Sequence, residues 1–279
     1  MSIARAVEAL LIMATDPVPA ADLAAQLGVP EREVVAVSRV SVQVDAGSVT
    51  CLVGESGSGK TTLARIAAGL DKPTAGSIHY RGQDISQLRG PDFMRFRREV
   101  QYVHQDPYAS LNPTRTVLST VLSALGARRN RTRRRATELL ERVELTPADL
   151  FLERYPHQLS GGQRQRVALA RALATEPALI IADETTSMLD ASIRGSMINL
   201  LSELRDDLGV GFLFITHDFT LARHFAWRGR TAVLYLGELV EYGPTPEVMD
   251  APKHAYTKAL IDALPMIRFD DADVPDGAP

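Results

Sequence analysis

A glycine-rich segment with one lysine and adjacent threonines carries the clearest chemical pattern in the sequence. It matches G-x-x-x-x-G-K-[ST] and runs through Gly54, Glu55, Ser56, Gly57, Ser58, Gly59, Lys60, Thr61 and Thr62. Glycines let the backbone curl so that successive N–H groups point at phosphate oxygens, and the positive end of a following helix strengthens the attraction. Lys60 is expected to reach the β- and γ-phosphates of a nucleotide, and Thr61 to offer its hydroxyl to Mg²⁺. We therefore predict a nucleoside-triphosphate site at this segment.

Two adjacent carboxylates supply the second half of the expected chemistry. Asp183 and Glu184 directly follow the apolar run 179–182. Ligands bind at the carboxyl ends of parallel strands, so Asp183 would hold Mg²⁺ through water and Glu184 would polarise an attacking water. A strand that ends in two acids is, by itself, equally compatible with a surface turn. Its position downstream of the phosphate-binding segment favours the catalytic interpretation.

The elements that must position these groups alternate between strand and helix. An apolar strand precedes the glycines and a helix follows them as far as Gly69. Residues 114–158 have a mainly helical pattern, and the later expected strands are 179–182, 211–215 and 231–236, each separated by a helical segment. This alternation predicts an α/β fold with a parallel sheet flanked by helices.

The bulk composition is that of a globular protein without a membrane span. The chain has 279 residues, is 45% apolar, has a mean hydropathy of −0.05 and a formal charge of −3. Its apolar runs are far shorter than the roughly 20 residues of a membrane-crossing helix, and its start does not fit a secretory signal. We expect a cytoplasmic protein, with the single cysteine, Cys51, as a buried hydrophobic residue. The charge gives no reason to expect binding to nucleic acid.

The two ends of the chain differ from its centre. Residues 1–34 are expected to be helical, since Ile3, Val7, Leu10 and Leu11 share one helical face. Residues 270–279 contain four aspartates and two prolines, which predicts a disordered acidic tail. The expected domain between them spans residues 35–269.

Five further segments resemble the ATP-binding-cassette (ABC) family. They follow one another in the order found in the family. The first is 105–107, which contains Gln105, and the second is the signature 159–163, which contains Ser160, Gly161, Gly162 and Gln163. The others are the helix 164–173, the segment 187–190 with Asp190, and the segment 215–218 with His217. The resemblance covers about residues 36–266. It implies a P-loop NTPase fold with a mainly parallel RecA-like core sheet, a small antiparallel β part and an inserted helical subdomain at about residues 106–164.

The resemblance also implies roles for these residues. ATP and Mg²⁺ would be the cofactors, and a second ABC ATPase subunit, identical or different, would pair head to tail with this one. Ser160 and the residues up to Gln163 would then clamp the γ-phosphate bound to the second subunit, and Asp190 would belong to the same nucleotide site. His217 would contact the γ-phosphate and position Glu184, while Gln105 would sense Mg²⁺ and water.

Three segments are similar to the peptide, dipeptide and nickel importer ATPases. They are residues 103–113, 235–241 and His254–Leu260, and generic cassettes lack the last of them. This subfamily implies ATP-driven import of peptides or a related small solute. Its partners would be transmembrane permease subunits and, indirectly, an extracytoplasmic solute-binding protein. The chain would lie peripherally on the inner face of the cell membrane.

Two features depart from the family pattern. No aromatic residue precedes Tyr80, although family members stack adenine on an aromatic side chain upstream of the phosphate loop. Residues 1–34 stand there instead and resemble the N-terminal region of segregation and condensation protein B, with a helix-turn-helix pattern whose second helix is short. Loss of the ring is expected to weaken ATP binding about tenfold or more. Thr185 also replaces the usual proline.

Other functions stay open at this point. A non-transport ABC ATPase, in phosphonate metabolism or associated with DNA, would share the motifs, and the cassette could be impaired by its atypical N-terminus. Chromosome-organising ATPases carry long coiled coils between the Q-loop and the signature, whereas Gln105 and Ser160 are only 55 residues apart. The presence of Lys60, Asp183, Glu184 and His217 argues against a module without turnover.

Overall fold

The core of the molecule is a six-stranded sheet. The structure is a computed structural model, and it describes residues 10–13, 37–104, 106, 110–125, 132–186 and 190–263. The strand order is β10-β9-β3-β8-β7-β6. Their bounds are β3 Val49–Val53, β6 Val100–Val103, β7 Leu179–Asp183, β8 Gly211–Thr216, β9 Arg230–Tyr235 and β10 Glu238–Pro244. All neighbours pair in parallel except β9 and β10, which form an antiparallel hairpin. The predicted parallel α/β sheet is therefore confirmed, and it places the carboxyl ends of β3, β7 and β8 at one edge.

A second, antiparallel sheet lies beside the core and corrects one expectation. Its order is β2-β1-β4-β5, with β1 Leu10–Met13, β2 Ser41–Val44, β4 Ser77–Tyr80 and β5 Gln83–Asp84. Leu10 and Leu11, which were expected in a helix, belong to a strand that pairs with β2 on one side and β4 on the other. A run of four apolar residues has no period of its own, so strand pairing on both edges decides its conformation. The expectations for residues 1–9, 14–34 and 270–279 fall outside the described residues.

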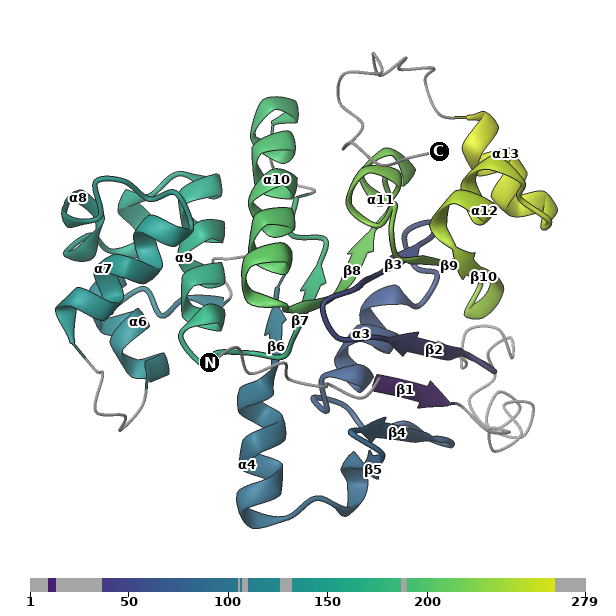
Figure 1. The fold of residues 1–279 in the computed structure, drawn as a ribbon, viewed down its shortest axis with the longest axis horizontal. Helices are drawn as coiled ribbons and strands as arrows, with labels where there is room; N and C mark the ends of the chain where they lie inside the picture. Colours follow the sequence, from purple (N-terminus) through teal and green to yellow (C-terminus); the bar gives the residue numbers. More distant parts are fainter. Residues whose placement is uncertain are drawn as a thin grey trace, which may run out of the picture.

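Helices cover both faces of the core sheet (Figure 1). Helices α3 (Lys60–Ala67) and α4 (Gly90–Glu99) pack on one face, where Leu52 and Phe96 belong to one hydrophobic cluster. Helices α10 (Ala191–Leu208) and α11 (Phe219–Phe225) pack on the other face, where Cys51 and Val53 of β3 join the larger cluster. Alternate residues of β3 thus face opposite layers. Cys51 is fully buried, as predicted, and this burial raises the pKa of its thiol.

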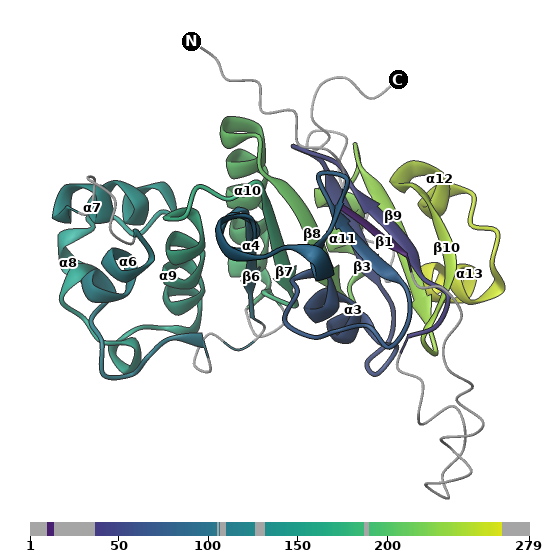
Figure 2. The same ribbon diagram turned by 90° about the horizontal axis from the view of Figure 1, so that it is seen from below.

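A helical lobe lies at one end of the molecule (Figures 1 and 2). Between β6 and β7 the chain forms α6 (Val117–Leu125), α7 (Arg133–Arg142), α8 (Asp149–Leu152) and α9 (Gly161–Leu173). Helices α6 and α7 pack on α9, and α9 packs on β6. At the opposite end, α12 (Thr245–Asp250) and α13 (Ala255–Asp262) lie beside β10. Among the described residues, short 3₁₀ helices also lie at Ile85–Gln87 and Pro156–Gln158.

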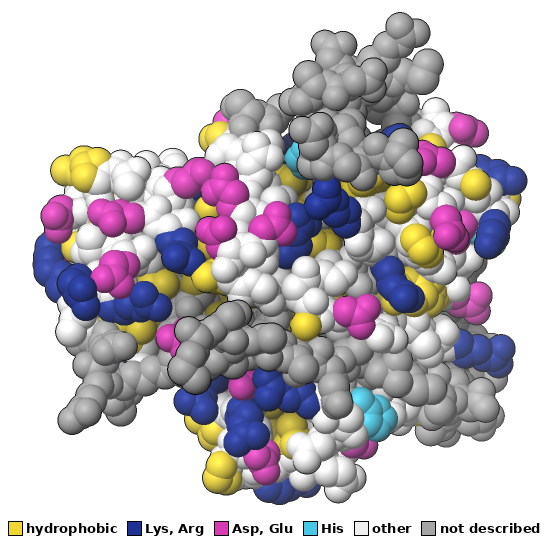
Figure 3. All heavy atoms as spheres, in the orientation of Figure 1, with side chains coloured by type: hydrophobic (Ala, Val, Ile, Leu, Met, Phe, Trp, Pro, Cys, Tyr) yellow, Lys and Arg dark blue, Asp and Glu magenta, His cyan; other side chains and the backbone are white. Residues whose placement is uncertain are grey.

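One face of the molecule carries charged side chains of both signs. In Figure 3, acidic and basic side chains are interspersed over most of the face shown, and basic side chains gather over α4. No helix within the described ranges is long and apolar enough to span a bilayer.

Candidate nucleotide-binding site

The glycine-rich segment forms a turn between β3 and α3, and β9 packs tightly against its start. Gly57 and Gly59 have φ angles of 81° and 99°, which favour glycine. A Cβ atom on Gly54 would lie 2.2 Å from the carbonyl oxygen of Leu234, so no larger residue fits there. Ser58 accepts a hydrogen bond at its carbonyl oxygen from the Gly237 N–H, at 3.1 Å. The sheet therefore fixes the position of the predicted phosphate cradle.

Lys60 is folded into this turn. Its side chain is buried, and its Nζ donates hydrogen bonds of 2.7 Å to the carbonyl oxygens of both Gly54 and Glu55. Burial lowers the pKa of Lys60, and the carboxylates of Glu184 and Asp183 oppose that shift. The ammonium group is thus placed between the phosphate loop and the two acids that end β7.

Asp183 joins three elements of the site. It is 2% exposed, and its Oδ1 accepts a 3.2 Å hydrogen bond from the Thr61 hydroxyl. Its Oδ2 accepts a 2.5 Å hydrogen bond from the hydroxyl of Tyr102 on β6. Burial raises the pKa of Asp183, whereas the bonds from Tyr102 and Thr61 lower it because they favour the charged form. The carboxylate is thereby held in place beside the predicted magnesium ligand Thr61.

Tyr102 was not singled out by the sequence. Nothing in the residues around Tyr102 indicates a contact with Asp183, because only the order of the strands in space makes β6 the neighbour of β7. The register pairs Tyr102 with Ile181, so the Tyr102 ring lies on the face of the sheet that also carries Asp183, two residues further along β7. Burial and the adjacent Asp183 raise the pKa of Tyr102, so its hydroxyl stays protonated and donates.

Glu184 and His217 come together from the ends of β7 and β8. The Glu184 N–H donates to the carbonyl oxygen of Ile215, at 3.0 Å, and Glu184 has a φ of 45°. A positive φ is uncommon outside glycine and occurs at functional sites. His217 Nδ1 lies 3.6 Å from Glu184 Oε1, and the His217 side chain is half exposed. This distance is too long for a direct hydrogen bond but short enough for an electrostatic contact.

The signature segment forms the N-terminus of α9, in the helical lobe. Ser160 is the N-cap: its Oγ accepts from the Gln163 N–H at 3.2 Å, and Gln163 Oε1 accepts from the Ser160 N–H at 3.0 Å. Ser160 and Gly161 are exposed, and a Cβ on Gly161 would meet open space. None of the hydrogen bonds recorded for the described residues joins this segment to the phosphate loop. Figures 1 and 2 show α9 at one end of the molecule and α3 across β6 and β7 from it.

The remaining predicted site residues are less constrained. Asp190 is the exposed N-cap residue of α10. Gln105 lies outside the described residues, and so do residues 187–189. Thr185 is buried, and within the described part of the chain its hydroxyl has no hydrogen-bond partner.

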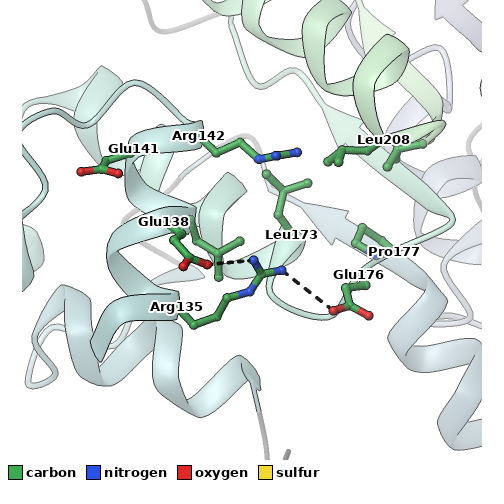
Figure 4. A pocket seen from close by; sticks show the side chains of 10 residues that line it. Arg135, Glu138, Glu141, Arg142, Leu173, Glu176, Pro177 and Leu208 are labelled. Carbon is green, nitrogen blue, oxygen red and sulfur yellow. Dashed lines mark hydrogen bonds and ion pairs between the residues drawn. The ribbon is translucent and has the colours of Figure 1, made fainter. Parts of the chain in front are cut away.

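A cavity of about 540 Å³ lies away from all of these residues. It is formed by α7, the end of α9, residues Glu176 and Pro177, and the end of α10. Figure 4 shows Arg135 between two carboxylates, with Glu138 at 3.1 Å and Glu176 at 3.9 Å. Its charged side chains largely pair with one another, so the cavity offers no clear complement to a nucleotide.

A metal in this region would depend on few protein ligands. In the part of the chain that the structure describes, no cluster of three or more His, Cys, Asp or Glu side chains is arranged around a common point. Thr61 and Asp183 nevertheless offer hard oxygen atoms 3.2 Å apart. Magnesium is typically bound by one or two such groups together with phosphate oxygens, so these two residues fit Mg²⁺ bound with a nucleotide.

Fold and site define a P-loop nucleotide-binding protein of the α/β class. The family model described as ABC transporter matches residues 37–187, and the model described as oligopeptide/dipeptide transporter, C-terminal region, matches residues 240–277. The chain belongs to the ABC transporter family. The resemblance inferred from the signature and its companion motifs is confirmed, and the segment His254–Leu260 lies within the second match.

Individual relatives agree with this classification. The glutathione import ATP-binding protein GsiA of Pectobacterium atrosepticum and that of Escherichia coli K12 are both 44% identical over 239 residues, or 84% of this chain. The chain spans only 38% of the length of these relatives. The dimeric ATP-binding cassette MJ0796 bound to ADP and phosphate is 35% identical, with a TM-score of 0.67 over 75% of this chain and 90% of that one. The protein cbiO1 of Clostridium perfringens, part of the cbiONQ transporter complex, is 28% identical, with a TM-score of 0.68 over 77% and 84%.

Proposed function

We propose that this chain is the ATP-binding and ATP-hydrolysing subunit of an ABC importer for peptides or a related small solute. One observation carries the proposal: Lys60, Thr61, Asp183, Glu184 and His217 converge at one edge of the sheet, in a chain whose C-terminal part matches the oligopeptide/dipeptide transporter region. That C-terminal match favours an importer over a DNA-associated or metabolic ATPase.

Nucleotide binding follows from the phosphate loop. Its backbone N–H groups and the N-terminus of α3 attract phosphate oxygens, and Lys60, held at the loop by its carbonyl groups, reaches the β- and γ-phosphates. Thr61 and Asp183 hold Mg²⁺, and Gln105 is proposed as a third contact. When bound, the ion neutralises charge on the β- and γ-phosphates.

Hydrolysis is the task of Glu184. Its carboxylate polarises the water that attacks the γ-phosphate, and the strained backbone at this residue fixes where the carboxylate points. His217, 3.6 Å from Glu184, holds the carboxylate in this direction and contacts the γ-phosphate. The exposed position of His217 leaves it accessible to a nucleotide.

A second cassette completes each site. The exposed N-terminus of α9, with Ser160 and Gly161, offers N–H groups and a helix dipole to an anion, and we propose that this anion is the γ-phosphate bound to the partner. The dimeric form of MJ0796 supports this arrangement. Asp190, at the start of α10, lies on the same proposed interface. ATP then holds two cassettes together, and hydrolysis releases them.

Transport requires further chains. We propose that transmembrane permease subunits bind the cassette at the inner face of the membrane, and that a solute-binding protein delivers the cargo to them from outside. The name of the relative GsiA gives glutathione as its cargo, and glutathione is itself a small peptide. We therefore propose a small peptide as the class of cargo.

The test is the Glu184→Gln variant of the full chain. We expect it to bind ATP, to lose ATP turnover, and to accumulate as an ATP-dependent dimer in size-exclusion chromatography. A Glu176→Gln variant, which removes a carboxylate beside Arg135 far from the nucleotide, is the matched control and should behave as wild type. Unchanged turnover in Glu184→Gln would contradict the proposed base. A wild-type chain that binds no ATP would contradict the proposed function as a whole.

A further inference from the structure

We propose that Tyr256, in the C-terminal part of the chain, is a positioning residue for the phosphate loop. The Glu55 N–H donates a 3.2 Å hydrogen bond to the Tyr256 hydroxyl, across 201 positions of the sequence. The inference rests on the proposed ATP site and adds a residue to it from the other end of the chain. It also gives the C-terminal segment, which generic cassettes lack, a task at the nucleotide.

The hydrogen bond acts on a particular peptide group. The Glu55 N–H and the Gly54 carbonyl belong to one peptide unit, and that carbonyl oxygen accepts a 2.7 Å bond from Lys60 Nζ. Tyr256 and Lys60 therefore hold opposite ends of the same peptide plane. In the structure, these two bonds together set the orientation of the peptide.

Tyr256 is itself held firmly. Its ring lies 4.1 Å from the ring of Tyr235, at the end of β9. Its N–H donates to Nδ1 of His254, the N-cap of α13, at 3.2 Å. The carboxylate of Glu241 on β10 accepts from the N–H groups of Lys253, at 2.8 Å, and His254, at 3.1 Å. The hydroxyl is thus fixed to the same hairpin that packs against the phosphate loop.

The protonation state of Tyr256 suits this task. Burial raises the pKa of the Tyr256 hydroxyl, so the group is neutral at physiological pH. A neutral hydroxyl accepts the Glu55 N–H through one lone pair and keeps its own proton for a second partner. The contact therefore does not depend on pH in the range where the protein works.

Binding of ATP makes Tyr256 more important. When Lys60 contacts the β- and γ-phosphates, their oxygens compete with the carbonyl oxygens of Gly54 and Glu55 for its three N–H donors. The bond from the Glu55 N–H to Tyr256 does not involve Lys60 and takes no part in this competition. Tyr256 thus holds the orientation of the loop while Lys60 turns towards the phosphates, and this favours the nucleotide-bound state.

The experiment compares Tyr256→Phe with Tyr235→Phe in the full chain. Both variants keep the ring pair and lose one hydroxyl, but only Tyr256 bonds to the loop. For Tyr256→Phe we expect the Kd for ATP and the KM of ATP hydrolysis to rise about fivefold, the size of one lost hydrogen bond, with kcat within about twofold of wild type. Hydrogen exchange without nucleotide should be faster at the Glu55 amide. Tyr235→Phe should leave all four quantities unchanged.

Different outcomes separate this inference from the proposed function. Equal ATP affinity and equal Glu55 exchange in both variants would overturn the role of Tyr256 while leaving the ATPase intact. A fall in kcat at constant Kd and KM would also overturn it, because a residue that positions the binding loop acts on affinity. Absence of hydrolysis or transport in wild type would contradict the proposed function, whereas ATP affinity and amide exchange would still test Tyr256.

Discussion

The phosphate loop and the N-terminus of α9 differ in how far each is built into the rest of the chain. At the phosphate loop, Thr61 contacts Asp183 from β7, and Asp183 contacts Tyr102 from β6, so three distant segments fix one carboxylate. At α9, Ser160 and Gln163 bond to each other, three residues apart, and the helix end stays exposed. One region is organised by the whole fold and the other by a single turn of helix. This is the construction expected of a site whose second half comes from another chain.

The largest expected effect is on ATP turnover, when the phosphate loop is disabled in one chain and the N-terminus of α9 in another. Lys60→Ala and Ser160→Arg should each reduce ATP turnover about a hundredfold or more, since one removes a charge at the phosphates and the other blocks the helix end. Mixed in a homodimer, the two variants form one intact composite site, so ATPase assays of the mixture should recover part of the lost activity.

If the mixture recovers no ATPase activity, the proposal that each site is shared between two chains would be contradicted. That result would mean that the exposed helix end acts on its own chain or on a different subunit. The control is the Lys60→Ala variant alone at the same total protein concentration.

The next largest effect is expected at His217. His217→Ala should lower kcat about a hundredfold, because Glu184 and the γ-phosphate lose the group that aligns them. Binding of ATP, measured by titration, should change less than about threefold, since the loop and Lys60 make most of the contacts with phosphate. A His217→Ala enzyme that keeps wild-type kcat would remove His217 from the reaction.

A smaller effect, with a pH signature, is expected at Tyr102. In Tyr102→Phe the carboxylate of Asp183 loses a hydrogen bond that favours its charged form, so its pKa, already raised by burial, rises further. Because the ionised carboxylate is the active form, the acid limb of the pH–rate profile should move to higher pH. A profile identical to wild type would show that Tyr102 does not control Asp183.

The smallest effect should be one of stability. The Thr185 hydroxyl is buried without a partner among the described residues, so Thr185→Val should raise the free energy of unfolding by about 1 kcal/mol. The matched control is Thr231→Val, which breaks the buried 2.9 Å hydrogen bond to Thr245 and should lower it by about as much. Chemical denaturation measures both. Destabilisation by Thr185→Val would show that its hydroxyl has a role in the fold.

Local chemistry made the candidate site predictable. The phosphate loop needs glycines, one lysine and one hydroxyl in sequence, and the acids need only an apolar strand before them. These requirements are short-range, so Lys60, Asp183 and Glu184 could be named as candidates without knowledge of the fold, whereas Ser160 was named from the resemblance to the ABC signature. The alternation of strands and helices likewise predicted the parallel sheet, because side-chain periodicity depends on neighbours along the chain.

Tertiary structure alone decided the contacts between distant segments. Leu10–Met13 became a strand because β2 and β4 pair with it on both sides, which no four-residue pattern reveals. Tyr102 reaches Asp183 because β6 lies next to β7, and Tyr256 reaches Glu55 because β9 and β10 carry α13 to the phosphate loop. The sequence determined which residues could do the chemistry. Strand order and packing, which depend on interactions across the whole chain, determined which residues hold them in place.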